Sequence, residues 1–389
     1  MKKIKIMPLF GTRPEAIKMA PVIKKLKQCS HFLVQVAVTG QHREMLDQVL
    51  DLFSIKPDYD LDIMESNQTL NQVSAAVLQK LKPVLEKNRP DLVLVQGDTT
   101  TAFMGALTAF YEKIKVGHIE AGLRTNRKYA PYPEEVNRRL TGDIADLHFA
   151  PTPLASRNLQ LENISEDSIY VTGNTVIDAL QEIITGNFKF ENEKINQIDF
   201  ENNFVLLFTC HRRENIGQLE SIFQSVKKLL TQNEDLEVIF PVHMNPVIQK
   251  NARKFFSNVE RIHLLEPLEY IPFVNLMACS DLVLTDSGGI QEEAPSLGKP
   301  VLVMRRVTER PEGLKAGTIK LIGTEKGKIV QEVQQLIDDR VEYEKMAQRI
   351  NPYGDGRAAQ RIKNIILTEF GYRDNFDDQF VPESPADNG

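Results

Sequence analysis

The sequence predicts an α/β fold in which two Rossmann-like domains face each other across a cleft. Short apolar runs rich in β-branched residues alternate with helical patterns from end to end, which is typical of parallel α/β sheets. A chain of 389 residues is also too long for one ordinary core. The polar stretch 186–203 lacks strong periodicity and separates two alternating sets, so it is a candidate boundary region. We predict an N-terminal domain at 1–172 and a C-terminal domain at 173–356.

The first half divides into alternating strands and helices. Strands are expected at 3–10, 32–39, 92–96, 116–119, 147–150 and 169–171. Helices are expected at 14–28, 44–53, 69–88, 101–112, 133–145 and 175–184, the earliest with a proline in its first turn. The basic, apolar start of the chain leads directly into the first strand without a small-residue cleavage site. We therefore interpret it as a strand and not as a signal peptide.

The second half repeats the alternation. Strands are expected at 204–209, 236–240, 261–264, 282–285, 301–304 and 318–322. A helix is expected at 290–297, stopped by Gly298 and Pro300, and a final helix at about 357–370. The tail 372–389 is acidic and rich in proline and asparagine, which predicts disorder.

Composition excludes several classes of function. The net charge of −6 argues against nucleic acid or an anionic membrane as the main partner. No run approaches the roughly 20 apolar residues of a membrane span. The cysteines Cys29, Cys210 and Cys279 are scattered without metal-ligand spacing. A reduced, cytoplasmic enzyme is the expectation.

The stretch Asp286–Pro300, DSGGIQEEAPSLGKP, predicts a nucleotide site. It joins a buried strand to a helix through a Ser-Gly-Gly turn, and free N–H groups at such a turn favour phosphate. Glu292 and Glu293 follow within one turn, and a carboxylate can accept two hydrogen bonds from a ribose diol. The alternative is a turn that needs glycine only for packing.

Charged residues also follow the strands of the first half. Arg13 and Lys18 come after the first strand, where an arginine can grip a diphosphate at two oxygens. A plain surface arginine is the alternative. Three acids lie after later strands or at the start of a helix: Asp98, Glu120 and Glu134. Arg124 and Arg138 lie close to these acids in the sequence. Asp98 alone could be a helix N-cap, and Glu134 could merely satisfy a helix dipole. Clustered carboxylates, however, split their pKa values and can serve as base and acid.

Histidines follow two strands of the second half. His211 lies after the first of these strands and His243 after the second, where a functional role is favoured over core packing. No HExxH spacing indicates zinc and no GxSxG turn indicates a nucleophilic serine, so no metal site is expected.

Taken together, the motifs resemble those of the non-hydrolysing bacterial UDP-N-acetylglucosamine 2-epimerases over roughly residues 4–365. The segments that carry the resemblance are GTRPEAIKMAP, TGQHREMLDQV, GDTTTAFMGA, HIEAGLRT, PYPEEVNRR, TGNTVIDAL, HRRENIG, PVHMNP, DSGGIQEEAPSLGKPV and NPYGDGRA. The resemblance implies a glycosyltransferase-B-type fold, with the helix 357–370 packed back on the first domain. It implies interconversion of UDP-GlcNAc and UDP-ManNAc through 2-acetamidoglucal and UDP, without NAD or metal. We also expect a homodimer.

The resemblance assigns roles to individual residues. The expected catalytic residues are Lys18, Asp98, Glu120, Glu134, Arg138 and His211; which acid takes the proton stays open. The expected UDP ligands are Arg13, Phe273, Ser287, Gly288, Gly289 and Glu293.

Some family members bind a second UDP-GlcNAc as an activator, and a matching site would comprise Gln41, His42, Gln68, Arg212, Glu214 and His243. This chain departs from that pattern at Glu44 and Asn67.

The alternatives in function are an epimerase of a modified UDP-sugar such as a 2,3-diacetamido-uronic acid, a glycosyltransferase, and an inactive UDP-sugar sensor.

Overall fold

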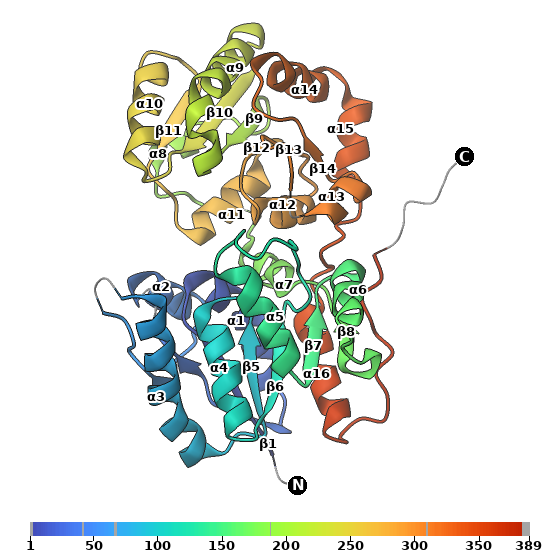
Figure 1. Cartoon of the computed structure of the whole chain (residues 1–389). Coiled ribbons are helices and arrows are strands. Elements are labelled where there is room, and N and C mark those ends of the chain that lie inside the picture. The colour runs from blue at the N-terminus through green and yellow to red at the C-terminus, as the bar shows by residue number, and fades with distance from the viewer. Residues whose placement is uncertain (1–2, 41–42, 66–67, 187, 309, 383–389) are drawn as a thin grey trace. The chain divides into compact units, whose positions relative to one another are not determined.

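The computed structural model describes residues 3–40, 43–65, 68–186, 188–308 and 310–382. The chain forms two compact units (Figure 1): unit 1 consists of Met1–Ala179 and Tyr353–Val381, and unit 2 of Leu180–Pro352 and Pro382–Gly389. Each contains a sheet whose strand pairs, within the described residues, are all parallel. The predicted α/β class with two Rossmann-like, parallel-sheet units is therefore confirmed.

Unit 1 is organised around a parallel sheet in the order β4-β3-β1-β5-β6-β7-β8, with β2 also on β1. Its strands are β1 (Ile4–Phe10), β2 (Phe32–Val34), β3 (Ala37–Val38), β4 (Tyr59–Asp60), β5 (Leu92–Gln96), β6 (Lys115–Ile119), β7 (Leu147–Ala150) and β8 (Ile169–Val171). Its helices are α1 (Arg13–Lys27), α2 (Arg43–Leu52), α3 (Leu70–Asn88), α4 (Thr100–Tyr111), α5 (Glu134–Ile144), α6 (Pro153–Leu161), η1 (Glu166–Ser168), α7 (Thr175–Ile183, which continues into unit 2) and α16 (Ala358–Glu369).

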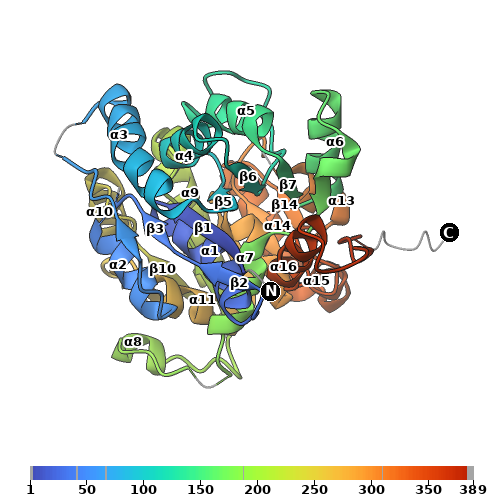
Figure 2. The ribbon, with the colours of Figure 1, turned by 90° about the horizontal axis from the view of Figure 1, so that it is seen from below.

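The central strands of unit 1 are buried on both faces. All five residues of β5 are buried, as the continuous apolar run predicts. One face is covered by α3, α4 and α5 and the other by α1 and α16 (Figure 2). The core on the α3 and α4 side joins Val77, Leu81 and Leu85 to the strand residues Leu9 and Val93. This packing fixes the turns that follow the strands.

Unit 2 has the strand order β11-β10-β9-β12-β13-β14. When its six strands are numbered along the chain, this order is 3-2-1-4-5-6, the doubly wound arrangement of dinucleotide-binding folds. Its strands are β9 (Phe204–Phe208), β10 (Leu236–Pro241), β11 (Ile262–Leu265), β12 (Leu282–Thr285), β13 (Val301–Val303) and β14 (Ile319–Leu321). Its helices are α8 (Glu193–Asn196), η2 (Arg213–Gln218), α9 (Leu219–Gln232), α10 (Pro246–Phe256), α11 (Tyr270–Cys279), α12 (Ile290–Glu293), η3 (Ala294–Leu297), α13 (Pro311–Ala316), α14 (Lys326–Asp338) and α15 (Arg340–Ala347).

The unit 2 core lies between its sheet and the pair α9 and α14, which pack side by side (Figure 1). The ring centroids of Phe208 and Phe223 lie 6.1 Å apart in an edge-on arrangement, and the ring centroid of Phe240 lies 4.4 Å from that of Phe208. These aromatic rings anchor β9 and β10, whose carboxyl ends carry the two histidines predicted as functional.

Several predicted boundaries differ from the structure. The expected strand 32–39 is interrupted, although β2 and β3 both pair with β1. The helix expected at 290–297 begins as α12 and continues as the tighter η3. Sequence reasoning missed α6, which Thr152 caps through a hydrogen bond from the N–H of Ala155.

The division between the units lies at Ala179–Leu180, inside α7, and not at 172–173 as predicted. The Asp178 carboxylate accepts hydrogen bonds from the N–H groups of Ala358 and Ala359, at 3.1 and 2.9 Å. These bonds tie α7 to the first turn of α16 within unit 1. Unit 1 therefore keeps the start of α7 and also the segment Tyr353–Val381.

The first part of the tail is ordered, contrary to the predicted disorder of 372–389. Phe380 is buried, and its N–H donates to the carbonyl of Val171 at 2.8 Å. Arg361 binds Asp378, and the Phe376 ring packs against Tyr170 at 6.1 Å. Residues 383–389 lie outside the described residues.

No helix in the described part of the chain combines the length and the apolar run that a bilayer crossing requires.

Candidate active site

The turns at the carboxyl edge of unit 1 bring the predicted polar residues of β1, β5 and β6 together. These three strands are neighbours in the sheet and run parallel. The chain leaves β1 toward one face of the sheet, where α1 lies, and leaves β5 toward the other face, where α4 lies. Open α/β sheets bind ligands at the point where the connections change faces in this way. Lys18, Asp98 and Glu120 are thereby gathered at one edge from distant parts of the sequence.

Glu120 is the most constrained acid of this edge. It is a non-glycine residue with φ of 66°, in the left-handed region that costs about 1–3 kcal/mol. Its carboxylate accepts hydrogen bonds from Lys18 at 2.5 Å, from Asn174 at 3.0 Å and from Gln96. Only 8% of the side chain is exposed. Three side chains from different elements thus hold a strained residue in one orientation.

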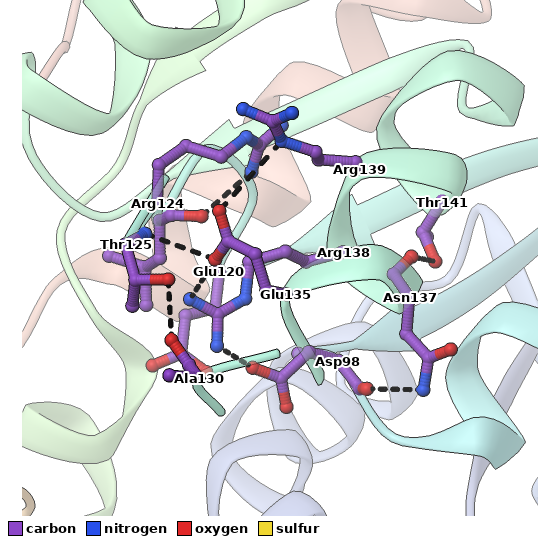
Figure 3. Close-up of polar contacts among 12 residues, drawn as sticks. Asp98, Glu120, Arg124, Thr125, Ala130, Glu135, Asn137, Arg138, Arg139 and Thr141 are labelled. Atoms are coloured by element: carbon purple, nitrogen blue, oxygen red, sulfur yellow. Dashed lines mark hydrogen bonds and ion pairs between the residues drawn. The ribbon is translucent and has the colours of Figure 1, made fainter. Parts of the chain in front are cut away.

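Asp98 lies beside Glu120 and is paired with Arg138, whose guanidinium reaches across from α5 (Figure 3). The backbone around it is also held, because Asn137 donates to the Asp98 carbonyl at 3.0 Å. Burial raises the pKa of Asp98, and the Glu120 charge adds to this rise while Arg138 and Lys18 oppose it. Asp98 is therefore a carboxyl group whose protonation depends on its neighbours, as a proton-transfer residue requires.

The turn before Asp98 is fixed by a buried histidine. The Nε2–H of His118 donates to the Gly97 carbonyl at 2.7 Å. Burial lowers the pKa of His118 to about 3, so the ring is neutral. Gly97 itself has φ of 69°, which glycine adopts without strain.

The start of α5 places Glu134 and Arg138 one turn apart. Within the described residues, Glu134 Oε2 and Arg138 Nε are buried and have no hydrogen-bond partner. Buried polar atoms are nearly always paired in folded proteins. Both atoms belong to residues of α5 that the sequence predicted as catalytic.

Glu135 supports the loop that leads into α5. It accepts hydrogen bonds from the N–H groups of Thr125 and Asn126 at 3.0 and 2.9 Å, and Arg138 approaches it at 3.4 Å. Figure 3 shows Arg138 extending from α5 toward both Glu135 and Asp98.

Arg124, which the sequence analysis grouped with the three acids, has a structural role. It forms a two-point ion pair with Glu162, at 2.9 and 2.6 Å, and stabilises the loop structurally.

Unit 2 presents its own polar edge where β9 and β12 lie side by side, again at the switch point of the sheet. Asp286 is fully buried and accepts hydrogen bonds from the N–H groups of His211 and Arg212 and from the Asn215 amide. The His211 ring lies 3.2 Å from the same carboxylate. Burial lowers the pKa of His211, and Asp286 opposes this shift.

The DSGG turn follows β12 as predicted. The Ser287 N–H donates to the Thr285 hydroxyl at 2.9 Å, so this N–H is already used inside the turn. A Cβ on Gly288 would lie 3.4 Å from the Arg212 guanidinium, so an arginine lies directly beside the turn. Of the two acids, Glu292 is buried and paired with Arg310, whereas Glu293 is partly exposed.

The other predicted ligands lie in separate places. Arg13 opens α1 and is partly buried, and Phe273 lies partly buried in α11. Among the expected activator residues, Gln68 donates to the Ile63 carbonyl at 2.8 Å and Glu214 pairs with Arg305 at 2.9 Å. The exposed His243 stacks on His211 at 5.5 Å.

Gln41, His42 and Asn67 lie outside the described residues, as does the side chain of Glu44. In the described part of the chain, no group of three or more His, Cys, Asp or Glu residues could hold a metal ion.

Comparison with known proteins places the chain in one family. The family model described as UDP-N-acetylglucosamine 2-epimerase matches residues 24–367. The chain is 53% identical to the UDP-N-acetylglucosamine 2-epimerase of Bacillus subtilis, over 98% of this chain and 100% of that protein. It belongs to the UDP-N-acetylglucosamine 2-epimerase family.

Solved structures agree with this placement. The crystal structure of the Neisseria meningitidis UDP-GlcNAc 2-epimerase bound to UDP-GlcNAc has a TM-score of 0.84 and 49% identity, over 94% of this chain and 100% of that one. A co-structure of Staphylococcus aureus MnaA with UDP has a TM-score of 0.86 and 48% identity, over 98% and 100% of the two chains. A glycosyltransferase of kitacinnamycin, 12% identical with a TM-score of 0.65, shares the fold alone.

Sequence reasoning missed several polar residues of this epimerase-family chain. Glu15, Gln96 and Asn174 had no assigned role, yet Gln96 and Asn174 bind Glu120. Asp286 was treated as part of a glycine turn and not as the acceptor for His211. The spacing Thr12-x-x-Glu15, a helix-capping signature, could have found Glu15, and Asp286 follows a buried strand as the other acids do.

Proposed function

We propose that this chain interconverts UDP-GlcNAc and UDP-ManNAc by inverting C2 of the sugar. The observation that carries the proposal is the acid cluster of unit 1, in which Asp98 and Glu120 are each bound by a cation and Glu134 has an unpartnered, buried oxygen. Family membership supports the same reaction, since the relatives are named UDP-N-acetylglucosamine 2-epimerases.

The proposed route is elimination followed by re-addition. A carboxylate takes the C2 proton, the C1–C2 double bond forms, and the C1–O bond breaks with its electron pair moving to the β-phosphate of UDP. The products are 2-acetamidoglucal and UDP. A UDP oxygen then bonds to C1 again, while C2 receives a proton on its other face and the second epimer results.

Inversion needs proton-transfer groups that can reach both faces of C2, and the unit 1 edge offers Asp98, Glu120 and Glu134 for this. Their fixed positions matter, because proton transfer requires hydrogen-bond reach in the reacting complex. Lys18 pairs with Glu120 and Arg138 with Asp98, and both cations can stabilise the negative charge that develops.

In this proposal unit 2 retains UDP between the two half-reactions. Arg212 and the Ser287–Gly288 turn offer positive charge and close backbone approach to a diphosphate, with Gly289 and Arg13 as further proposed contacts. Glu293 is the proposed ribose acceptor and Phe273 the proposed packing surface for uracil. His211, oriented by Asp286, is the proposed partner of the leaving phosphate.

The elimination route transfers a proton and no hydride, so it needs no NAD, and we propose that it also proceeds without a metal. We further propose that the ManNAc nucleotide supplies synthesis of cell-surface polysaccharide.

The test is incubation with UDP-GlcNAc in D₂O, with C2 followed by NMR. Deuterium at C2 together with both the gluco and the manno isomers is expected. Release of UDP without exchange at C2 would contradict the proposal.

A further inference from the structure

A buried carboxylate behind the acid cluster joins two of its turns. Glu15, in the first turn of α1, is 2% exposed. Its Oε2 accepts hydrogen bonds from the Gly11 N–H at 3.0 Å and from the Thr12 N–H and hydroxyl, each at 2.7 Å. Its Oε1 accepts one from the Thr99 hydroxyl at 2.6 Å.

The two oxygens of Glu15 have separate tasks. The bonds to Oε2 all come from the β1–α1 turn and cap the helix. The bond to Oε1 crosses to the β5–α4 turn, which is 84 residues away in sequence. Capping of α1 is thus complete without Oε1, and the Thr99 bond needs another explanation.

Thr99 directly follows Asp98. Its hydroxyl donates to Glu15 and accepts from the Ala102 N–H at 3.0 Å, so it joins α1 to the start of α4. With the His118 bond to Gly97 and the Asn137 bond to Asp98, the backbone on both sides of Asp98 is held by side chains.

A carboxylate this deeply buried is costly. Burial raises the pKa of Glu15, and the hydrogen bonds from Thr99, Thr12 and Gly11 oppose the rise. A neutral residue could cap the helix at less desolvation cost, whereas a carboxylate gives the Thr99 hydroxyl a strong acceptor.

We propose that Glu15 is a positioning residue for the epimerase reaction, acting through the Thr99 hydroxyl to fix Asp98 relative to the substrate. This inference rests on the proposed function, because it takes Asp98 to be a proton-transfer group. A misplacement of about 1 Å at a reacting group can cost about 100-fold in rate.

The test substitutes each partner of the Glu15–Thr99 hydrogen bond in turn. Thr99→Val removes the hydroxyl, and Thr99→Ser keeps it. Glu15→Gln leaves a carbonyl oxygen for the α1 cap and places an amide N–H₂ opposite Thr99. Thr152→Val is the matched control, because Thr152 caps α6 in the same way, through the N–H of the residue three positions on.

Turnover and KM for UDP-GlcNAc are measured for each variant, with the melting temperature of each. Thr99→Val and Glu15→Gln should each lower kcat by about 10- to 100-fold while KM changes by less than about threefold. Thr99→Ser should restore most of kcat. The double variant should be no slower than the slower single variant, because both remove one interaction.

Three outcomes would overturn the inference: normal kcat in Thr99→Val and Glu15→Gln, additive losses in the double variant, or an equal loss in Thr152→Val. Deuterium exchange at C2 by the unaltered protein is measured first. Its absence would overturn the proposed function itself, which separates the two failures.

Discussion

Removing the cation beside Asp98 should shift the pH dependence of turnover. In Arg138→Met, the Asp98 carboxylate loses its ion-pair partner and keeps Glu120 as a neighbouring acid. Burial and Glu120 already raise the pKa of Asp98 and Arg138 opposes them, so its pKa should rise further in the variant.

The size of the shift follows from the geometry. An adjacent arginine lowers an aspartate pKa by about 1–3 units. The Asp98 side chain is 28% exposed, so solvent screens part of this effect. We therefore expect the pKa of Asp98 to rise in Arg138→Met, by less than removal of an arginine from a fully buried pair would give.

The assay is kcat against pH for the unaltered protein, Arg138→Met and Arg139→Met. Arg139 is the matched control: it is 48% exposed and pairs with Glu135 and Glu162, not with Asp98. The limb of the profile that reports Asp98 should move to higher pH in Arg138→Met alone. Coincident profiles for the two variants, both folded by circular dichroism, would refute the reasoning.

Two further predictions concern stability. Gly122→Ala should destabilise unit 1 by more than about 2 kcal/mol in denaturant unfolding, since Gly122 has φ of 89° and a Cβ there would lie 2.1 Å from the Ala155 carbonyl oxygen. Gly217→Ala, with nothing within 4 Å, should change little, and equal effects of the two would count against the described turn. For Asp178, burial raises the pKa from 3.8 to about 6. A raised acid pKa stabilises the fold below the unfolded pKa, and this stability is lost as pH rises through the folded pKa. We compare the unfolding free energy of the unaltered protein with that of Asp178→Asn. The difference, unaltered minus variant, should fall by up to about 3 kcal/mol between about pH 4 and about pH 6.5. A difference that stays constant over this range would contradict the described burial.

The sequence predicted the parts of the site that depend on strand order alone. Asp98 and Glu120 each follow a buried apolar run, and the carboxyl ends of parallel strands share one edge of the sheet. Lys18 could be placed near that edge because it lies one turn into the helix that follows the first strand.

The missed residues depend on partners that are distant in the sequence. Glu15 meets Thr99 and Asp286 meets His211 only after folding, and no local pattern encodes such a pair. The tail was predicted disordered from its composition, yet Phe376, Asp378 and Phe380 bind residues far away in the sequence, which composition does not show. The division inside α7 was missed because helical periodicity continues across it.

The central proposal is that Asp98, Glu120 and Glu134 act on the sugar and that other residues hold UDP. Its most direct test is deuterium exchange at C2 of UDP-GlcNAc by Asp98→Asn and Glu134→Gln, with UDP affinity measured on the same samples. The account predicts that both variants lose exchange and still bind UDP. Near-normal exchange in both variants would contradict it.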